Sequence, residues 1–188
     1  MSDRVIDQAQ EAVLRTLLIA LPLLVLARTD TRDAPVEVDD LDLAARVAEG
    51  VSASQQNRPD LTFRFGYAPC EFRGNRQALR SLTPNLMDNA ARHTRTSVDV
   101  SVTVSGGESR IQVDDDGDGL SPEDCERVFD RCVRLDESRD RNEGGSGLGL
   151  AIVASVAESN GGRAFAAPGP GGNFTINLRD SSSTLPTP

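Results

Sequence analysis

Aromatic residues are scarce in this sequence, which has no tryptophan, one tyrosine and six phenylalanines, together 4% of its 188 residues. Hydrophobic residues still make up 38% of the chain, so most of them are aliphatic. A chain of this length can bury a proper core in one domain and still carry an appendage. We therefore expect one domain with an aliphatic core.

Basic residues, cysteines and long hydrophobic runs are also in short supply. The chain has 20 Lys and Arg against 29 Asp and Glu, a formal net charge of −9, which argues against nucleic-acid binding. Its three cysteines form no Cys-x-x-Cys pair, so we expect reduced thiols in a cytoplasmic protein, without a zinc site or disulfide framework. The apolar run at residues 17–27 contains Pro22 and is too short to span a bilayer, and we recognise no signal peptide.

The start of the chain has the apolar spacing of a long helix over residues 2–28, kinked at Pro22. Its apolar stripe broadens from Leu17 to Val25, and a helix this apolar needs a covering surface. That surface is its own domain, a second copy of the chain or a partner helix. A homodimer formed through this helix is one of the expected arrangements.

The remaining elements follow from alternating apolar residues in strands and from helical apolar spacing. Strands are expected at residues 35–38, 61–65, 70–72, 97–104, 110–113, 163–167 and 174–178. Helices are expected from Asp39 or Asp40 to about Val51, from Asn75 onward, from Ser121 through Phe129, and over residues 148–160. Gly106 and Gly107 predict a hairpin turn between two of the strands.

Two asparagines, Asn85 and Asn89, lie four residues apart in the helix that begins at Asn75, so both project from the same side. Asparagine is a poor residue for a helix interior. The pair is either a set of exposed or capping amides, or it has a function. Arg92 lies on the next turn and could meet a phosphate, and Pro84 costs the helix a hydrogen bond.

An acidic cluster at residues 114–118 follows a predicted strand and contains Gly117. Its spacing does not match the longer run of oxygen ligands in an EF-hand calcium loop. It is either a plain acidic loop or a carboxylate at a strand end, followed by glycines that let a ligand approach the backbone. We favour the second interpretation.

A charged segment at residues 130–143 precedes a run of glycines at residues 144–149 and an apolar helix. A loop of this length and polarity suggests a function. Glycines in front of a helix are either a tight connection or an anion site, because the first N–H groups of a helix have no partner within it.

These motifs, taken in order, resemble those of the ATP-binding catalytic domain of sensor histidine kinases, in the superfamily of gyrase, Hsp90 and MutL ATPases. The matching segments are residues 85–94 (N box), 115–119 (first glycine box), 129–136 (F box) and 145–150 (second glycine box). The resemblance implies an α+β fold of the Bergerat type, a two-layer α/β sandwich with a mixed sheet. The ATP-binding domain would span residues 31–179, with a lid at residues 130–146.

We make separate predictions for the regions on either side of that domain. Residues 1–30 resemble the second helix of a histidine kinase dimerisation hairpin, and the hairpin's first helix has no counterpart in this sequence. Residues 180–188 are expected to be a disordered tail.

The resemblance also implies which residues hold Mg²⁺ and ATP. Asp115 would accept a hydrogen bond from the adenine amino group, and Asn89 would bind Mg²⁺ through its amide oxygen. Asn85, Asn89 and Arg92 would form the catalytic set. The nucleotide-contacting residues implied in total are Asn89, Arg92, His93, Asp115, Gly117, Gly119, Arg131, Gly145, Gly147, Leu148, Gly149 and Leu150.

The chemistry expected is phosphoryl transfer. Asn85 stands where gyrase-like and Hsp90-like members carry a glutamate base, and an amide cannot take a proton from water. The only histidine, His93, lies inside the N box, so the phosphoacceptor histidine must come from another dimerisation helix or a partner kinase. A response regulator would be the next partner. The alternatives are a non-catalytic module that docks a partner kinase, or an anti-sigma-type serine kinase.

Two positions depart from the family pattern. Cys132 occupies a place in the F box that is commonly phenylalanine, which bears on how the lid docks. Pro84 directly precedes the first asparagine of the N box, which bears on where the asparagine pair lies.

Overall fold

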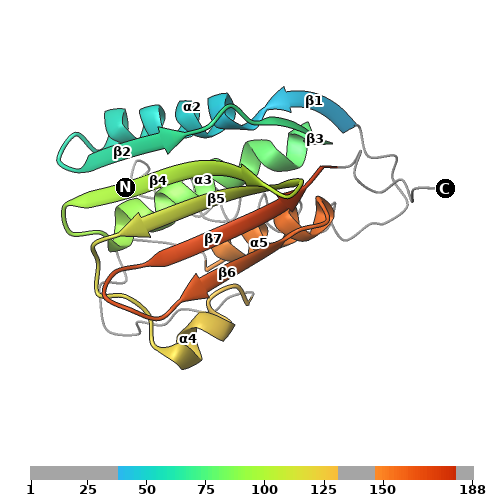
Figure 1. The fold of residues 1–188 in the computed structure, drawn as a ribbon. Coiled ribbons are helices and arrows are strands. Elements are labelled where there is room, and N and C mark those ends of the chain that lie inside the picture. The colour runs from blue at the N-terminus through green and yellow to red at the C-terminus, as the bar shows by residue number, and fades with distance from the viewer. Residues whose placement is uncertain (1–37, 131–146, 181–188) are drawn as a thin grey trace, which may run out of the picture.

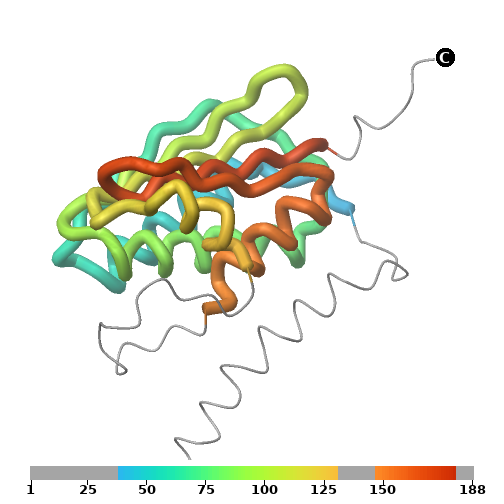
Figure 2. The backbone as a smooth tube through the Cα atoms, turned by 90° about the horizontal axis from the view of Figure 1, so that it is seen from below, coloured from blue at the N-terminus to red at the C-terminus, as the bar shows by residue number. Residues whose placement is uncertain are grey.

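A computed structural model describes residues 38–130 and 147–180, which form a five-stranded sheet with helices on one face (Figures 1 and 2). The strand order across the sheet is β2-β4-β5-β7-β6. β2 and β4 are parallel and the other neighbours are antiparallel, so the sheet is mixed. The strands are β2 (Thr62–Tyr67), β4 (Ser97–Ser105), β5 (Glu108–Asp115), β7 (Asn173–Arg179) and β6 (Arg163–Ala167). The predicted two-layer α/β sandwich is confirmed.

Three helices make the second layer, with α3 packed against both α2 and α5 (Figure 2). A small antiparallel sheet and a short helix complete the described part. These elements are α2 (Leu43–Asn57), α3 (Arg76–His93), α5 (Gly149–Ser159), β1 (Val38–Asp42), β3 (Glu71–Asn75) and α4 (Pro122–Arg127). None of the helices in the two described ranges is both long and apolar enough to cross a membrane.

The core lies between the sheet and the helices, and it is aliphatic as predicted. Val98, Val100 and Val102 of β4 are buried on the helix side, while the residues between them are polar and lie on the open face. The neighbouring strands β5 and β7 repeat this alternation, as a sheet with one solvated face requires. Among the described aromatic residues only Phe72 and Phe174 are buried.

The start of the first helix differs from the prediction. Of the strand expected at residues 35–38 only Val38 is described, and it opens β1, while the helix is capped by Asp42 in place of Asp39 or Asp40. The Asp42 carboxylate accepts a hydrogen bond from the Ala45 N–H at 3.0 Å. Residues 38–42 pair with β3, which places the two earlier aspartates within a strand. The helix then runs to Asn57, six residues past the expected end, since no glycine or proline interrupts residues 51–57.

Other local predictions are confirmed. Asn75 caps α3 by accepting from the Ala78 N–H at 3.0 Å, and Ser121 caps α4 by accepting from the Asp124 N–H at 3.1 Å. Helix α4 ends at Arg127, two residues short of the predicted Phe129. The predictions for residues 1–30, for the lid beyond Asp130 and for residues 181–188 lie outside the described residues.

Candidate nucleotide-binding site

Three consecutive aspartates lie at the end of β5, the last of them just beyond the strand, and the fold gives each a different environment. Asp114 lies on the open face, where it accepts from the Gln112 amide at 2.9 Å and from Asn173. Burial raises the pKa of Asp114, and the Gln112 hydrogen bond opposes that effect. Asp115 is buried on the helix side, and Asp116 turns to the loop that follows α3. The acidic run is therefore not simply a solvated loop.

Asp115 is only 8% exposed, and only one of its two carboxylate oxygens has hydrogen-bond donors. Its Oδ1 accepts from the Gly117 N–H at 2.9 Å and from the Gly172 N–H at 3.0 Å. Its Oδ2 is buried and has no hydrogen-bond partner among the described residues. A buried acceptor without a donor is costly, so this oxygen fits a hydrogen-bond donor brought by a ligand.

The loop before β7 completes this carboxylate site, which the sequence interpretation missed. The Asp115 N–H donates to the Gly172 carbonyl at 2.8 Å. A Cβ on Gly172 would lie 2.2 Å from Asp115 Oδ2, and one on Gly171, whose φ is 82°, would lie 2.0 Å from the Asp115 carbonyl oxygen. Residues 169–172 were expected only to connect two strands. The signal was the glycine run itself, because antiparallel pairing of β7 with β5 brings it to Asp115.

Gly117 and Gly119, the two glycines of the first glycine motif, lie where a larger side chain would clash. A Cβ on Gly117 would lie 2.2 Å from the His93 carbonyl oxygen at the end of α3. Gly119 has φ 81°, and a Cβ there would lie 1.9 Å from the Gly169 carbonyl oxygen. Both positions therefore require glycine. Their predicted contact with a nucleotide stays a prediction.

The asparagine pair lies half-buried on α3, one turn apart, with Arg92 and His93 exposed near the end of the helix. The Asn85 amide nitrogen donates to the Ser81 carbonyl at 2.7 Å. Its amide oxygen lies 3.2 Å from the position that a Cβ on Gly149 would occupy. Asn85 therefore presents its oxygen to the start of α5.

Pro84 does not interrupt α3, which is continuous from Arg76 to His93. The proline removes the N–H that would bond the Arg80 carbonyl, so the helix lacks one hydrogen bond at that point. Asn85 and Asn89 therefore lie one turn apart on a continuous helix.

The start of α5 offers backbone N–H groups beside Asn85. Gly147 has φ 68°, and Leu148 is the N-cap but makes no side-chain capping hydrogen bond. Leu148 and Leu150 are 2% and 8% exposed, so their side chains belong to the core and only their backbone can meet a ligand. The first N–H groups of a helix have no intrahelical partner and carry positive partial charge. This end of α5 suits a phosphate group.

No group of three or more His, Cys, Asp or Glu side chains in residues 38–130 and 147–180 is placed to hold a metal. The side chains of α3 offer amide oxygens instead, and Mg²⁺ accepts oxygen ligands together with phosphate oxygens and water. Of the predicted site residues, Arg131 and Gly145 lie outside the described residues, as does Cys132. The structure brings Asp115, Gly117 and the end of α3 together, and Asn85 meets the start of α5.

Residues 74–182 match the protein family described as histidine kinase-, DNA gyrase B- and HSP90-like ATPases. This range contains every described part of the candidate site. Among solved structures, the mycobacterial sensor histidine kinase MprB superposes with a TM-score of 0.67 and 26% identity, covering 76% of this chain and 97% of MprB.

Two sensor proteins are among the curated relatives of this chain. The sensor protein RstB of Escherichia coli K12 is 37% identical over 146 residues, which are 74% of this chain and 33% of RstB. The sensor histidine kinase CpxA of the same organism is 36% identical over 157 residues, which are 82% of this chain and 34% of CpxA. The chain thus spans about a third of the length of these relatives.

Proposed function

Because the chain belongs to the family of histidine kinase-, DNA gyrase B- and HSP90-like ATPases, we propose that it is the Mg-ATP-binding catalytic module of a two-component sensor histidine kinase. It transfers the γ-phosphoryl group of ATP to a protein histidine supplied by another chain or segment, and a response regulator then receives the phosphoryl group. The resemblance to CpxA, which is named as a sensor histidine kinase, supports this function. We place the module in the cytoplasm, where ATP is available.

The observation that carries the proposal is the buried, unpartnered Oδ2 of Asp115. The 6-amino group of adenine is a donor and would satisfy this oxygen. Guanine carries a carbonyl oxygen at that position, which would leave two acceptors facing each other. With Oδ1 already held by two backbone N–H groups, the carboxylate cannot turn to avoid that conflict. The site therefore selects adenine over guanine.

The phosphate end of the site is assigned to α3 and to the start of α5. The amide oxygen of Asn89 holds Mg²⁺, which supplies positive charge to the phosphate oxygens when it is bound. The Arg92 guanidinium, which is exposed, and the N–H groups of residues 147–150 hold the phosphates. Arg131 and Gly145 are assigned to the same end by the family pattern alone.

The asparagine at position 85 favours transfer over hydrolysis. Its nitrogen is committed to Ser81, and its amide oxygen has too little basicity to take a proton from water. In the transfer, the bond from the γ-phosphorus to the bridging oxygen of ADP breaks and a bond to an imidazole nitrogen forms. His93 lies inside the N box and is followed by Thr94, whereas the phosphoacceptor histidine of the family is usually followed by glutamate, so we do not assign it as the acceptor.

Titration calorimetry of Mg-ATP tests the pocket. We expect micromolar-range binding, about −7 to −8 kcal/mol, that Asp115→Ala abolishes. The matched control is Asp99→Ala, which removes an exposed carboxylate that is paired with Arg64 on the open face of the same sheet. Undiminished binding by Asp115→Ala, or an equal loss in the control, would sink the assigned pocket.

Phosphotransfer tests the activity once binding is established. The chain is incubated with Mg-ATP labelled on the γ-phosphate and a separate dimerisation hairpin that carries a histidine. We expect acid-labile label on the hairpin, lost when Asp115→Ala replaces the wild-type chain. Acid-stable phosphoserine, or no label at all on the hairpin, would contradict the kinase assignment while leaving ATP binding intact.

A further inference from the structure

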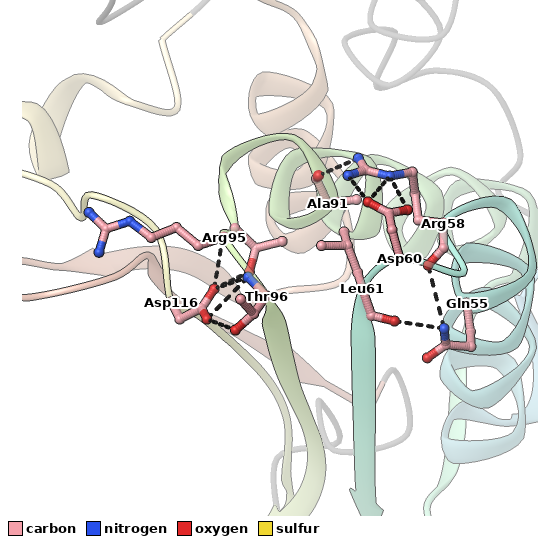
Figure 3. Close-up of polar contacts among 9 residues, drawn as sticks. Gln55, Arg58, Asp60, Leu61, Ala91, Arg95, Thr96 and Asp116 are labelled. Atoms are coloured by element: carbon pink, nitrogen blue, oxygen red, sulfur yellow. Dashed lines mark hydrogen bonds and ion pairs between the residues drawn. The ribbon is translucent and has the colours of Figure 1, made fainter.

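Asp116, the residue after the adenine acceptor, is surrounded by donors from the turn that follows α3. Its carboxylate accepts from the hydroxyls of Thr94 and Thr96, from the Arg95 N–H at 2.8 Å, and from the Thr96 N–H at 2.9 Å (Figure 3). These hydrogen bonds, those from Thr94 and Thr96 first, hold the pKa of Asp116 well below its ordinary value. The side chain is therefore ionised throughout the physiological range.

The turn that Asp116 holds is also the end of α3. Thr94 is the C-cap of that helix, and its N–H donates to the Ala90 carbonyl at 2.9 Å. Its hydroxyl oxygen also lies 2.8 Å from the Ser97 carbonyl oxygen, so its single O–H is shared between that carbonyl at the start of β4 and Asp116. The Asp116 N–H lies 3.3 Å from the same carbonyl oxygen. One carboxylate thus joins the end of α3 to the end of β5.

Two further contacts hold the end of α3 against the sheet. Gly117 lies so close to the His93 carbonyl that no side chain fits between them. Arg58, from the loop before β2, donates to the Ala91 carbonyl at 2.8 Å (Figure 3). The helix end is therefore fixed from both the β2 side and the β5 side, and Asp116 makes the link on the β5 side.

We propose that Asp116 is a positioning residue that holds the phosphate-binding helix α3 in register with the adenine acceptor on β5. The inference rests on the proposed function, which places the base at Asp115 and the Mg²⁺ and phosphates at Asn89 and Arg92. A nucleotide that binds at both ends needs a set separation between β5 and α3. Asp116 sets it, while Asp115 itself is oriented by Gly117 and Gly172.

Asp116→Asn keeps the shape of the side chain but weakens its hydrogen bonds to the turn that follows α3. A carboxylate accepts on both oxygens, whereas an asparagine accepts on one and would turn its NH₂ group toward the surrounding donors. The Thr96 hydroxyl can rotate to accept from that NH₂ group, but Asp116→Asn removes the charge that strengthens all of these hydrogen bonds and the second acceptor of the Thr96 N–H. Asp115 Oδ1 keeps the Gly117 and Gly172 N–H donors, so the base pocket stays formed while the end of α3 is released.

The test compares two ligands by calorimetry or by competition. Adenosine contacts only the base pocket, and Mg-ATP engages both ends of the site. For Asp116→Asn we expect adenosine affinity within about twofold of wild type and Mg-ATP affinity about tenfold weaker or more. Loss of a negative charge alone would strengthen binding of an anion, so weaker Mg-ATP binding cannot be a simple charge effect.

The matched control is Asp99→Asn. Asp99 is an exposed carboxylate of β4 that accepts hydrogen bonds from Arg64 at 2.9 and 3.1 Å on the open face of the sheet, away from α3. We expect both affinities to stay within about twofold of wild type. If Asp116→Asn does not fold, Thr96→Val removes one donor hydroxyl at constant shape and should give a smaller loss in the same direction.

The outcomes separate this inference from the proposed function. Parallel loss of both affinities, or no change in either, would overturn the positioning role of Asp116. A wild-type chain that binds neither adenosine nor Mg-ATP would instead overturn the proposed function, whatever the variants do.

Discussion

The residues around Asp115 determine which of its carboxylate oxygens is left for a ligand. Two backbone N–H groups from different loops hold one carboxylate oxygen and leave the other buried and unpaired. One of those loops, residues 169–172, is distant in sequence and reaches Asp115 only because β7 pairs with β5. The base site is therefore made by two strands, although only Asp115 looks functional in the sequence.

Gly172→Ala is the residue-scale test of that conclusion. The added Cβ would lie 2.2 Å from Asp115 Oδ2 and 2.9 Å from the Phe174 ring, so it must displace the one oxygen left for the ligand. We expect Mg-ATP affinity to fall by about tenfold or more, that is by about 1.4 kcal/mol or more, measured by calorimetry.

The control for this substitution lies in the same loop. A Cβ on Gly169 would meet nothing within 4 Å, so Gly169→Ala should bind Mg-ATP as the wild type does. Equal affinities for the two variants would mean that Gly172 does not shape the base pocket.

At the scale of elements, the proposed phosphate end depends on how α3 and α5 pack against each other. The start of α5 has N–H groups without a side-chain cap, and Asn85 of α3 lies against Gly149. Helical periodicity predicts both helices, because their apolar faces are regular. It does not show that Asn85 faces α5, since that depends on how the helices pack.

Pro84→Ala tests how much stability the protein loses because α3 contains a proline. Pro84 is exposed, and alanine would restore the hydrogen bond to the Arg80 carbonyl. We expect the free energy of unfolding, measured in urea, to rise by about 1–3 kcal/mol. This is the gain in helix stability minus the advantage that proline gives by restricting the unfolded chain.

The matched substitution is Gln77→Ala, at an exposed position near the start of the same helix, which should change stability by about 0.5 kcal/mol or less. Mg-ATP affinity should not change in Pro84→Ala, because the helix already runs unbroken through both asparagines. A destabilised Pro84→Ala variant would show that the proline fits a local bend that alanine cannot adopt.

At the scale of the whole molecule, the proposed nucleotide site spans the middle of the fold. β5 is the central strand of the five, and α3 is packed between α2 and α5 (Figures 1 and 2). A ligand held at Asp115 and at α3 therefore links the sheet to the helix layer. Ligand binding should raise the stability of the whole domain, not of a peripheral segment.

Thermal unfolding with two nucleotides tests this coupling and its base selectivity together. At a Mg-ATP concentration about a hundred times Kd, linkage adds about 2.7 kcal/mol, which should raise Tm by about 5–10 °C. Mg-GTP at the same concentration should leave Tm unchanged, because its carbonyl opposes Asp115 Oδ2. Equal shifts with both nucleotides would show that this carboxylate does not read the base.

The sequence by itself determined the family, the aliphatic core, most element positions and the order of the motifs. It could do so because apolar periodicity, caps and glycines act over a few residues, as Asn75 and Ser121 show at the starts of α3 and α4. The same local reasoning was wrong about the first helix cap, since pairing with β3 drew residues 38–42 into a strand.

Only the tertiary structure decided which groups meet. The Gly172 contact with Asp115 and the Asp116 link to the end of α3 both join residues more than 19 positions apart, and no local pattern encodes them. Antiparallel pairing of β7 with β5 brings the first pair together, and antiparallel pairing of β4 with β5 brings the second. Which oxygen of Asp115 is left for a ligand is a property of these long-range contacts, because only they use up the other one.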